Sequence, residues 1–496
     1  MKFTKLIFLI YFAMGLGLTT YSQNKVTLEE ALDIAFENSP DIKRSRLNME
    51  QNKELLNAQL ASLKSRFAFD VTPFSYVKQD SYDELRSAWY SNETMKSSGQ
   101  FSISQPIKVF DGTLSLINRF EYYDNVSGTG GVNKPDAGFS NNLYLQYVQP
   151  LFVYNQTKMN LERNQLNLEN ATLAYSIEML NMEKYVSQAF YDIYQRQMSL
   201  QVAIEEFENQ KVSKSIIESK VEGQLSAREE LFQAELNYAT SNSNLEDQKV
   251  ALENSKDEFK RLLGISLSEE IEVIADIQYK EVNVDLKQAV DNGLKQRLEL
   301  QQKEVNITNA QFDLIQTSAQ NKFRGDVSLS MGLMGNDPAF TGVYDKPTKS
   351  PQAGITFSIP LFDWGERKAR IRAAELSLES TKIDKQNLEN DIIINIRKVY
   401  RNLNNLIRQI GIADQNLRNA ELTYEINLER YSSGDLTSID LERFQNQLSE
   451  KKMNKVNALI SYKLELLNLK IQALWDFENN RSFVPQELQN NMLTED

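Results

Sequence analysis

Residues 430–441, which read RYSSGDLTSIDL, give the clearest local indication of the fold. Gly434 stands near the middle of this stretch, and the hydroxyl side chains of Thr437 and Ser438 follow it. Glycine readily adopts the left-handed conformation that ends a helix, and a hydroxyl group caps the start of the next one. The stretch therefore predicts a tight turn, with Gly434 ending one helix and Thr437 or Ser438 capping the second.

A similar turn occurs 211 residues earlier, where Gly223-Gln224-Leu225-Ser226 matches Gly434-Asp435-Leu436-Thr437. Gly223 and Ser226 are expected to end and cap helices there in the same way. Other matches join residues 26–32 to 284–290, 67–71 to 323–327 and 150–152 to 360–362. The chain is therefore a tandem repeat, and each half reads helix, strands, long helix, turn, helix.

The repeat sets the expected domain boundaries. We expect a first repeat over residues 23–275, with strands within 66–154 and long helices over 155–264. We expect a second repeat over 276–484, with strands within 323–366 and long helices over 367–476, followed by a C-terminal tail over 485–496.

The long helices carry an apolar repeat. Residues 155–322 and 367–484 contain no proline, which would break a helix. In the second of these stretches apolar residues recur in alternating steps of four and three, at Ile392, Ile396, Val399, Leu403, Leu406, Ile410, Ala413, Leu417, Ala420 and Tyr424. A period of ~3.5 residues is typical of helices that pack with a left-handed supercoil. On the helices alone, an ordinary cytoskeletal or adhesive coiled coil fits equally well.

The windows between the helices change to a two-residue period. Apolar residues alternate with small polar ones at Val327, Leu329, Met331 and Leu333, and again at Ala353, Ile355, Phe357 and Ile359. Phe67, Phe69 and Val71 begin the same pattern in the first window, which is also rich in tyrosine and phenylalanine. Strands of this kind, with aromatic residues near their ends, are typical of outer-membrane proteins. A soluble β-sandwich with one wet face shows a similar alternation.

The composition excludes several kinds of chemistry. The chain contains no cysteine and no histidine, so disulfides, thiolate nucleophiles, imidazole–metal sites and a lipid-modified N-terminal cysteine are all impossible. The formal charge of -13 argues against a general nucleic-acid binder. No glycine-rich phosphate loop opens a helix. We therefore expect no enzyme activity, no catalytic residue, no metal and no cofactor.

The N-terminus reads as a secretory signal peptide over residues 1–22. Lys2 and Lys5 precede an apolar run over residues 6–18, and Thr20 and Ser22 supply small residues before a cleavage site at Gln23. A retained membrane anchor is the alternative, although the run is shorter than the ~20 apolar residues of a membrane span. The mature protein is therefore expected to be exported.

Together these features resemble the TolC-type family of outer-membrane efflux and export channels. The motifs that carry the resemblance are TLEEAL at 27–32, QPLF at 149–152, RLLG at 261–264, IPLFD at 359–363 and the turn at 430–441. The motifs occur in the same order as in the family, and the resemblance extends over nearly all of the mature chain. No single motif decides the match; their order, duplicated at matching spacing, does.

The resemblance implies a fold that is mainly α-helical with transmembrane β-strands. Its strands are pooled by a homotrimer into one β-barrel, which a long periplasmic α-helical coiled-coil barrel continues. The four to six strands expected in one chain are fewer than the ~8 of the smallest lipid-spanning barrels, and an open sheet edge in lipid leaves backbone groups unpaired. Several chains must therefore pool their strands. The implied location is the outer membrane, without a lipid anchor.

The function implied by the resemblance is that of the exit duct of a tripartite efflux or type I secretion system. Such a duct passively conducts solutes that a periplasmic adaptor protein and an inner-membrane transporter deliver. The runner-up is a secreted or surface structural, adhesive coiled-coil protein. That alternative explains the apolar helix repeat but not the duplicated strand pairs.

An additional hairpin departs from the simplest family pattern. The offset between the halves falls from 256 at Val71 to 210 at Pro150, so the first half holds extra residues. Two strand patterns flank Phe110-Asp111-Gly112, which predicts a hairpin at about residues 97–125. The sequence leaves open whether this hairpin enlarges the barrel, caps it outside or folds against it.

The resemblance also carries residues of a gate at the narrow periplasmic end. Tyr431 matches a tyrosine of the family's closing hydrogen-bond network, and Asp440 matches the first of two aspartates that ring the constriction. Arg443 replaces the second ring aspartate and Leu436 replaces the arginine of the network, so the family's salt-bridged gate cannot be copied. The nearby Asp435 and Glu442 could restore negative charge, whereas each of these acids could equally be a solvated helix-surface charge.

The two turns are the expected contact with the adaptor. The residues proposed for this contact are Gly223, Leu225, Ser226, Gly434, Leu436 and Thr437. A leucine at an exposed turn is either packed sideways against its own chain or offered to a partner. The resemblance to the family favours contact of these leucines with the adaptor protein.

Overall fold

The computed structural model describes residues 24–84, 87–129, 132–224, 226–433 and 435–485. The predicted signal peptide, Leu225, Gly434 and all but the first residue of the predicted tail lie outside the described residues. The chain divides into two compact units. The first comprises residues up to 47, 173–300 and from 387 onward; the second comprises 48–172 and 301–386.

The helices repeat with equal lengths in the two halves. Helices α4 (Gln156–Glu222) and α8 (Glu366–Ser432) have 67 residues each, and α5 (Arg228–Leu263) and α9 (Ser438–Ala473) have 36 each. These bounds repeat at an offset of 210, one residue less than the offset of the two turn motifs. The motif match is therefore out of register with the helices by one residue.

Shorter helices precede the strands in each half. In the first half these are α2 (Leu28–Asn38) and α3 (Pro40–Ser62), and in the second α6 (Leu286–Gln296) and α7 (Leu298–Ala319). Thr27 and Glu30 form a capping box at the start of α2, which explains the first family motif. Among the described residues, no helix is long and apolar enough to cross a membrane.

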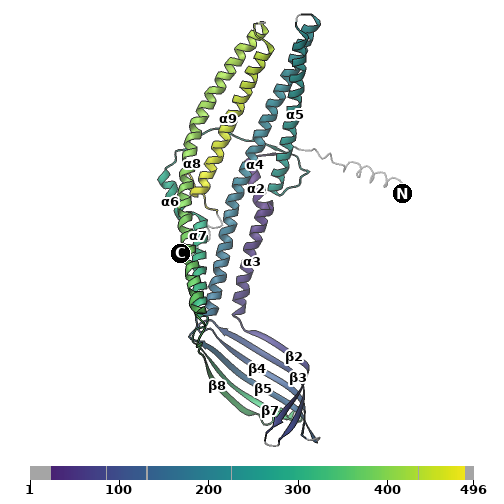
Figure 1. Ribbon diagram of the computed structural model, residues 1–496, viewed down its shortest axis with the longest axis vertical. Helices are drawn as coiled ribbons and strands as arrows, with labels where there is room; N and C mark the ends of the chain where they lie inside the picture. The colour runs from purple at the N-terminus through teal and green to yellow at the C-terminus, as the bar shows by residue number, and fades with distance from the viewer. Residues whose placement is uncertain (1–23, 85–86, 130–131, 225, 434, 486–496) are drawn as a thin grey trace, which may run out of the picture. The chain divides into compact units, whose positions relative to one another are not determined.

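The predicted apolar seam of α8 is buried inside the first unit. Ile392, Ile396, Val399 and Leu403 are each less than 5% exposed and pack with Tyr462 and Leu469 of α9. Figure 1 shows α8 beside α9 and α4 beside α5, as two helical hairpins of this unit. Two small sheets complete the unit. They pair β1 (Asn24–Val26) with β6 (Ile271–Val273) and β9 (Trp475–Asp476) with β10 (Arg481–Ser482).

Gly264 explains the RLLG motif at the end of α5. It adopts a left-handed φ of 73°, and its N–H donates to the carbonyl oxygen of Arg261 at 3.3 Å. A Cβ atom at this position would lie 2.4 Å from the carbonyl oxygen of Asn38, the last residue of α2. Glycine is therefore required both by the backbone angle and by the close approach of α2.

The second unit contains a six-stranded antiparallel sheet in the order β2-β3-β4-β5-β7-β8 (Figure 1). Its strands are β2 (Arg66–Asp83), β3 (Ala88–Ile107), β4 (Gly112–Thr129), β5 (Val132–Leu151), β7 (Arg324–Asp337) and β8 (Thr348–Ser358). The hairpin expected at about 97–125 is β3–β4, and it is longer than the alternating pattern indicated. Its strands continue through Tyr, Thr and Ser residues, which favour or tolerate extended backbone although they break the strict apolar alternation.

Candidate functional site

The turn between α8 and α9 is closed by backbone hydrogen bonds and one hydroxyl cap. The N–H of Asp435 donates to the carbonyl oxygen of Arg430 at 2.9 Å, which is the long bond of a Schellman-type helix end. Thr437 is the N-cap of α9, and its hydroxyl accepts from the N–H of Asp440 at 3.2 Å. Of the two predicted caps, Thr437 rather than Ser438 fills the position.

Asp440 takes part in this cap. Its carboxylate accepts a 2.7 Å hydrogen bond from the hydroxyl of Thr437, and its side chain is exposed in the first turn of α9. The N-terminus of a helix carries partial positive charge and favours an acidic group there. Within one chain Asp440 therefore stabilises the start of a helix, whatever it does in an assembly.

The turn between α4 and α5 differs from its prediction. Gln224, with φ 58°, is the residue in the left-handed conformation, while the N–H of Gly223 still donates to Ser219 at 3.0 Å as a helical residue does. The N-cap of α5 is Ala227, without a side-chain bond, and the Ser226 hydroxyl donates instead to the carboxylate of Glu230. The expected roles of Gly223 and Ser226 as helix end and cap were therefore wrong, because the repeat is shifted by one residue here.

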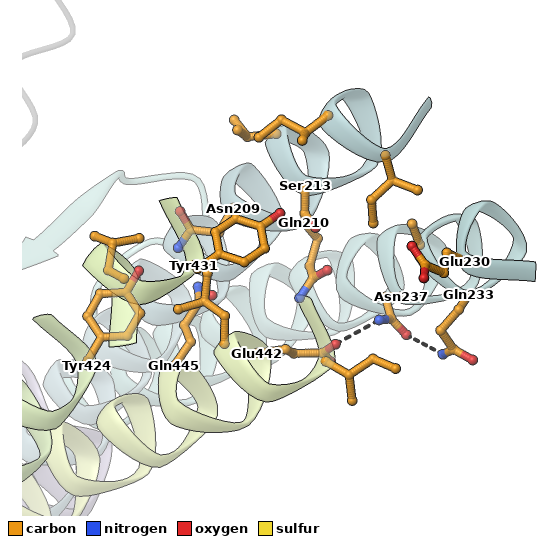
Figure 2. A pocket seen from close by; sticks show the side chains of 17 residues that line it. Asn209, Gln210, Ser213, Glu230, Gln233, Asn237, Tyr424, Tyr431, Glu442 and Gln445 are labelled. Carbon is orange, nitrogen blue, oxygen red and sulfur yellow. Dashed lines mark hydrogen bonds between the residues drawn. The ribbon is translucent and has the colours of Figure 1, made fainter. Parts of the chain in front are cut away.

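A cavity of about 230 Å³ lies between α4, α5, α8 and α9, close to the two turns (Figure 2). Apolar side chains such as Ile217 and Leu428 form part of its wall, and amides such as Gln210 and Asn237 form another part. Two of the four predicted gate residues, Tyr431 and Glu442, line it. Asp435 and Asp440 are not among the described residues around the cavity.

Glu442 is held across the cavity by a chain of amides. The Asn237 amide donates to its carboxylate at 2.7 Å, and Gln233 donates to the Asn237 carbonyl oxygen at 2.8 Å (Figure 2). Burial raises the pKa of Glu442, and the nearby Glu206 raises it further. The site therefore favours the protonated form of Glu442 more than water does, while Asn237 provides a donor for the ionised form.

Tyr431 is half-buried at the end of α8 and contacts the other hairpin. The ammonium group of Lys220, on α4, lies 5.8 Å from the centre of the Tyr431 ring, within the range of a cation–π interaction. Burial raises the pKa of Tyr431, and Glu230 on α5 adds to the effect. Tyr431 and Glu442 thus connect the second-half hairpin to the first-half hairpin at the same end.

The proposed docking tips are partly described. Gly223, Asp435 and Thr437 are exposed, Ser226 and Leu436 are half-buried, and Leu225 and Gly434 lie outside the described residues. The tips therefore offer hydrogen-bonding groups and one partly covered leucine.

Among the residues that the structure describes, no group of three or more His, Cys, Asp or Glu side chains is placed to hold a metal ion.

Asn237 was missed by the reading of the sequence. It lies beside Tyr238, one of the apolar residues that recur every seven positions along α5 at Leu231, Tyr238 and Leu245, and this repeat does not show which flanking positions face a second hairpin. The available signal was the pairing of amides and acids, Gln233, Asn237 and Glu442, near the ends of both hairpins. Only the packing of α5 against α9 distinguishes this pairing from ordinary surface polarity.

Comparisons with known proteins find similarity to outer membrane efflux proteins and channels. Residues 289–471 match the family model described as outer membrane efflux protein. The Campylobacter jejuni CmeC outer membrane channel is 14% identical and superposes with a TM-score of 0.71. The superposition covers 96% of this chain and 94% of the CmeC chain. The open state of the Neisseria gonorrhoeae MtrE outer membrane channel is 12% identical, with 91% and 90% coverage and a TM-score of 0.66. No curated protein matches the sequence at a significant level.

Proposed function

We propose that this chain is an outer membrane efflux protein and forms the exit duct through which an efflux or type I secretion system releases solute; the match of residues 289–471 to the model of that family supports the proposal. Channels of this family are trimeric and work with adaptor proteins and inner-membrane pumps. The duct itself supplies no energy and performs no reaction. Solute passes through it by diffusion once the periplasmic end is open.

The observation that carries the proposal is the sheet of the second unit. Phe67, Leu145 and Met331 are 65%, 47% and 66% exposed in the single chain, although all three are large and apolar. They lie in one row across the sheet, since Ile103 and Leu116 connect Phe67 to Leu145, which pairs with Met331. A continuous apolar face of this kind is what a lipid-facing strand presents.

The gate proposal rests on the cavity between the two helical hairpins. Tyr431 and Glu442 tie the second-half hairpin to Lys220 and Asn237 of the first half, so these contacts would hold the narrow end closed. Asp440 is proposed to line the entrance with its symmetry copies and to attract cations. Asp435 adds an exposed negative charge beside it.

The docking proposal rests on the turns. In a trimer, three copies of each turn would give six tips at the periplasmic end. Leu225 and Leu436 are proposed to contact an apolar groove of the adaptor, flanked by Gly223, Ser226, Gly434 and Thr437. Leu436 is partly covered by its own chain, so its contact with a partner would add to an existing side contact.

Fractionation and mass measurement test the proposed function. The full-length protein, expressed with the predicted signal peptide over residues 1–22, is expected to sediment with outer membranes and to have the mass of three chains in detergent. A protein recovered from the soluble periplasm or medium as a monomer would contradict the proposal. That result would favour a secreted structural coiled-coil protein instead.

A further inference from the structure

The β3–β4 hairpin has no counterpart in the second half of the chain. The sequence match places β7 in the position of β2, and it places the end of β8 in the position of the end of β5. The structure puts the inserted hairpin inside the sheet, because β3 pairs with β2 along most of its length and β4 pairs with β5. The insertion therefore widens the sheet from four strands to six.

The inserted strands carry the same two faces as the rest of the sheet. One row across all six strands reads Phe67, Ile103, Leu116, Leu145, Met331 and Pro351. The neighbouring row, on the opposite face, reads Arg66, Ser104, Ser115, Gln146, Ser330 and Gln352. A hairpin that capped the pore or lay against its outside would not need to continue both patterns through β3 and β4.

An ion-paired cluster of the inserted hairpin, formed by Lys96, Arg119 and Glu121, lies on the polar face. Glu121 of β4 accepts from Lys96 of β3 at 2.9 Å and from Arg119 at 3.1 Å. These residues are separated from Ser104 or Ser115 by an even number of positions along their strands, so they share the face of those serines. The ion pairs therefore lie on the face of the sheet opposite to Ile103. Asn118 and Asn141 interrupt the apolar face. Glu93 and Asp124 also share the register of that face, but they lie closer than Phe120 to the ends of β3 and β4 that face the β2–β3 and β4–β5 loops. The charges favour a watery side for the polar face and leave the apolar face for lipid.

Aromatic groups bound the apolar face at both ends. At one end Phe120 of β4 stacks on Phe139 of β5 at 5.9 Å and meets Phe340 at 5.2 Å. At the other end Phe323 lies 5.2 Å from Phe152. From Phe139 to Phe152, at ~3.3 Å per residue and a tilt of ~40°, the height is ~33 Å, close to the ~25 Å apolar band and its flanking girdles. The inserted hairpin thus supplies part of one girdle.

Both edges of the sheet are open, and their directions are complementary. The six strands alternate in direction, so β2 and β8 run opposite ways, and each can pair with the other edge of a second copy as an antiparallel neighbour. Six strands are fewer than the ~8 of the smallest lipid-spanning barrel, and unpaired edge groups are not tolerated in lipid. The occupant of each edge is therefore another copy of this chain.

We propose that β2 of one copy pairs with β8 of the next, and that three copies close a wall of eighteen strands in which β3 and β4 are membrane-spanning. The proposal rests on the proposed function, which supplies the membrane and the trimer. With strands ~4.8 Å apart and tilted by ~40°, eighteen strands give a backbone diameter of ~36 Å, against ~24 Å for twelve. The insertion would then widen the outer mouth for larger solutes without changing the helical tunnel.

Disulfide trapping tests the position of the hairpin, because the chain has no cysteine of its own. Arg119 of β4 faces Asn142 of β5, whereas Asp70 of β2 is three strands away from Asn142, or ~14 Å. In membrane-inserted trimers, the pair R119C/N142C is expected to crosslink within a chain, and the pair D70C/N142C is not. The reverse result would mean that the hairpin leaves the wall and β2 pairs with β5, which would overturn the proposal.

Crosslinks between copies and direct imaging complete the test. One cysteine at Ala68, Asp70 or Thr72 of β2, combined with one at Gln352 of β8, is expected to give covalent trimers in at least one combination. Single-particle images of the trimer are expected to show eighteen strands. An outer-membrane trimer with twelve strands would overturn this inference alone, whereas a soluble monomer would overturn the proposed function with it.

Discussion

The Asn237 side-chain amide donates a 2.7 Å hydrogen bond to the carboxylate of Glu442, and this bond joins α5 of the first repeat to α9 of the second. The carboxylate is half-buried, and its burial raises its pKa. A buried acceptor that loses its donor is costly, so the bond stabilises the contact of the two hairpins near their turns.

Asn237→Ala should loosen the contact between the two hairpins that we propose as the gate. Removing the donor leaves Glu442 without its partner on α5 and should cost about 1 kcal/mol of stability in each chain. In planar bilayers the variant should show a higher conductance than the wild type. Gln248→Ala, which removes only an amide bonded to Asn244 on the same helix, is the matched control. Equal conductance of Asn237→Ala and wild type would show that this bond does not hold the gate.

Two substitutions at Asp440 separate its charge from its helix cap. Asp440→Asn keeps an oxygen that can accept from Thr437 but removes the negative charge, so it should lower cation selectivity and cost no more than ~0.5 kcal/mol of stability at the exposed helix N-terminus. Asp440→Ala removes both the charge and the acceptor for the Thr437 hydroxyl, and should cost about 1 kcal/mol of stability. Reversal potentials in a salt gradient, together with thermal unfolding in detergent, give the two readouts. If Asp440→Asn leaves the selectivity as it was, Asp440 only caps α9.

The docking tips can be tested by Leu225→Asp combined with Leu436→Asp. Substitutions at surface turns usually change stability by no more than ~0.5 kcal/mol, and the half-buried Leu436 should lose somewhat more, whereas burying the new carboxylates in an apolar contact would cost far more. The double variant should therefore reach the outer membrane as a trimer at normal levels but fail to export and to copurify with its adaptor. Gln224→Asp, also in the first turn, adds charge without removing a leucine and serves as the control. Loss of the trimer would mean that the leucines pack within the tunnel wall, and unimpaired export would remove them from the adaptor contact.

Glu183 should make stability fall as the pH rises. Burial raises its pKa to about 7; Lys470 opposes the rise and Asp476 adds to it. Between pH 4.5, the pKa of an unperturbed glutamate, and about 7, the folded chain binds a proton that the unfolded chain releases, so raising the pH through this window removes stability, up to about 3 kcal/mol per chain. Thermal unfolding in detergent should show this slope for the wild type, and Glu183→Gln should flatten it. Glu218→Gln, on the exposed face of the same helix, should keep the wild-type slope; a slope that also survives Glu183→Gln would assign it to other groups.

The helices were predictable because their signal is long and redundant. Steps of four and three from Ile392 to Tyr424 fix both the helix and its buried side, and Ile396, Val399 and Leu403 are indeed buried. The duplication adds a second, independent copy of each boundary. Helix lengths of 67 and 36 residues in both halves follow from it.

The sequence was a poor guide where a single residue sets the position of a turn, or where a single packing contact sets how two elements lie together. Gly223 was expected to end α4, but the left-handed residue is Gln224, since equal helix lengths shift the turn by one position. The sequence showed an inserted hairpin, but only the register of β3 with β2 and of β4 with β5 shows that it joins the sheet. Likewise, the Asn237–Glu442 bond depends on how two hairpins pack, which the periodicity of a single helix does not specify.

Conductance of the purified trimer in a planar bilayer shows whether this chain forms a channel. Wild type and Asn237→Ala should be inserted from detergent under identical conditions, after the trimer has been verified by mass. A transenvelope duct predicts discrete conductance steps, larger in the variant with the loosened gate. If intact trimers of both proteins give no conductance above that of a protein-free bilayer, the chain is not a channel.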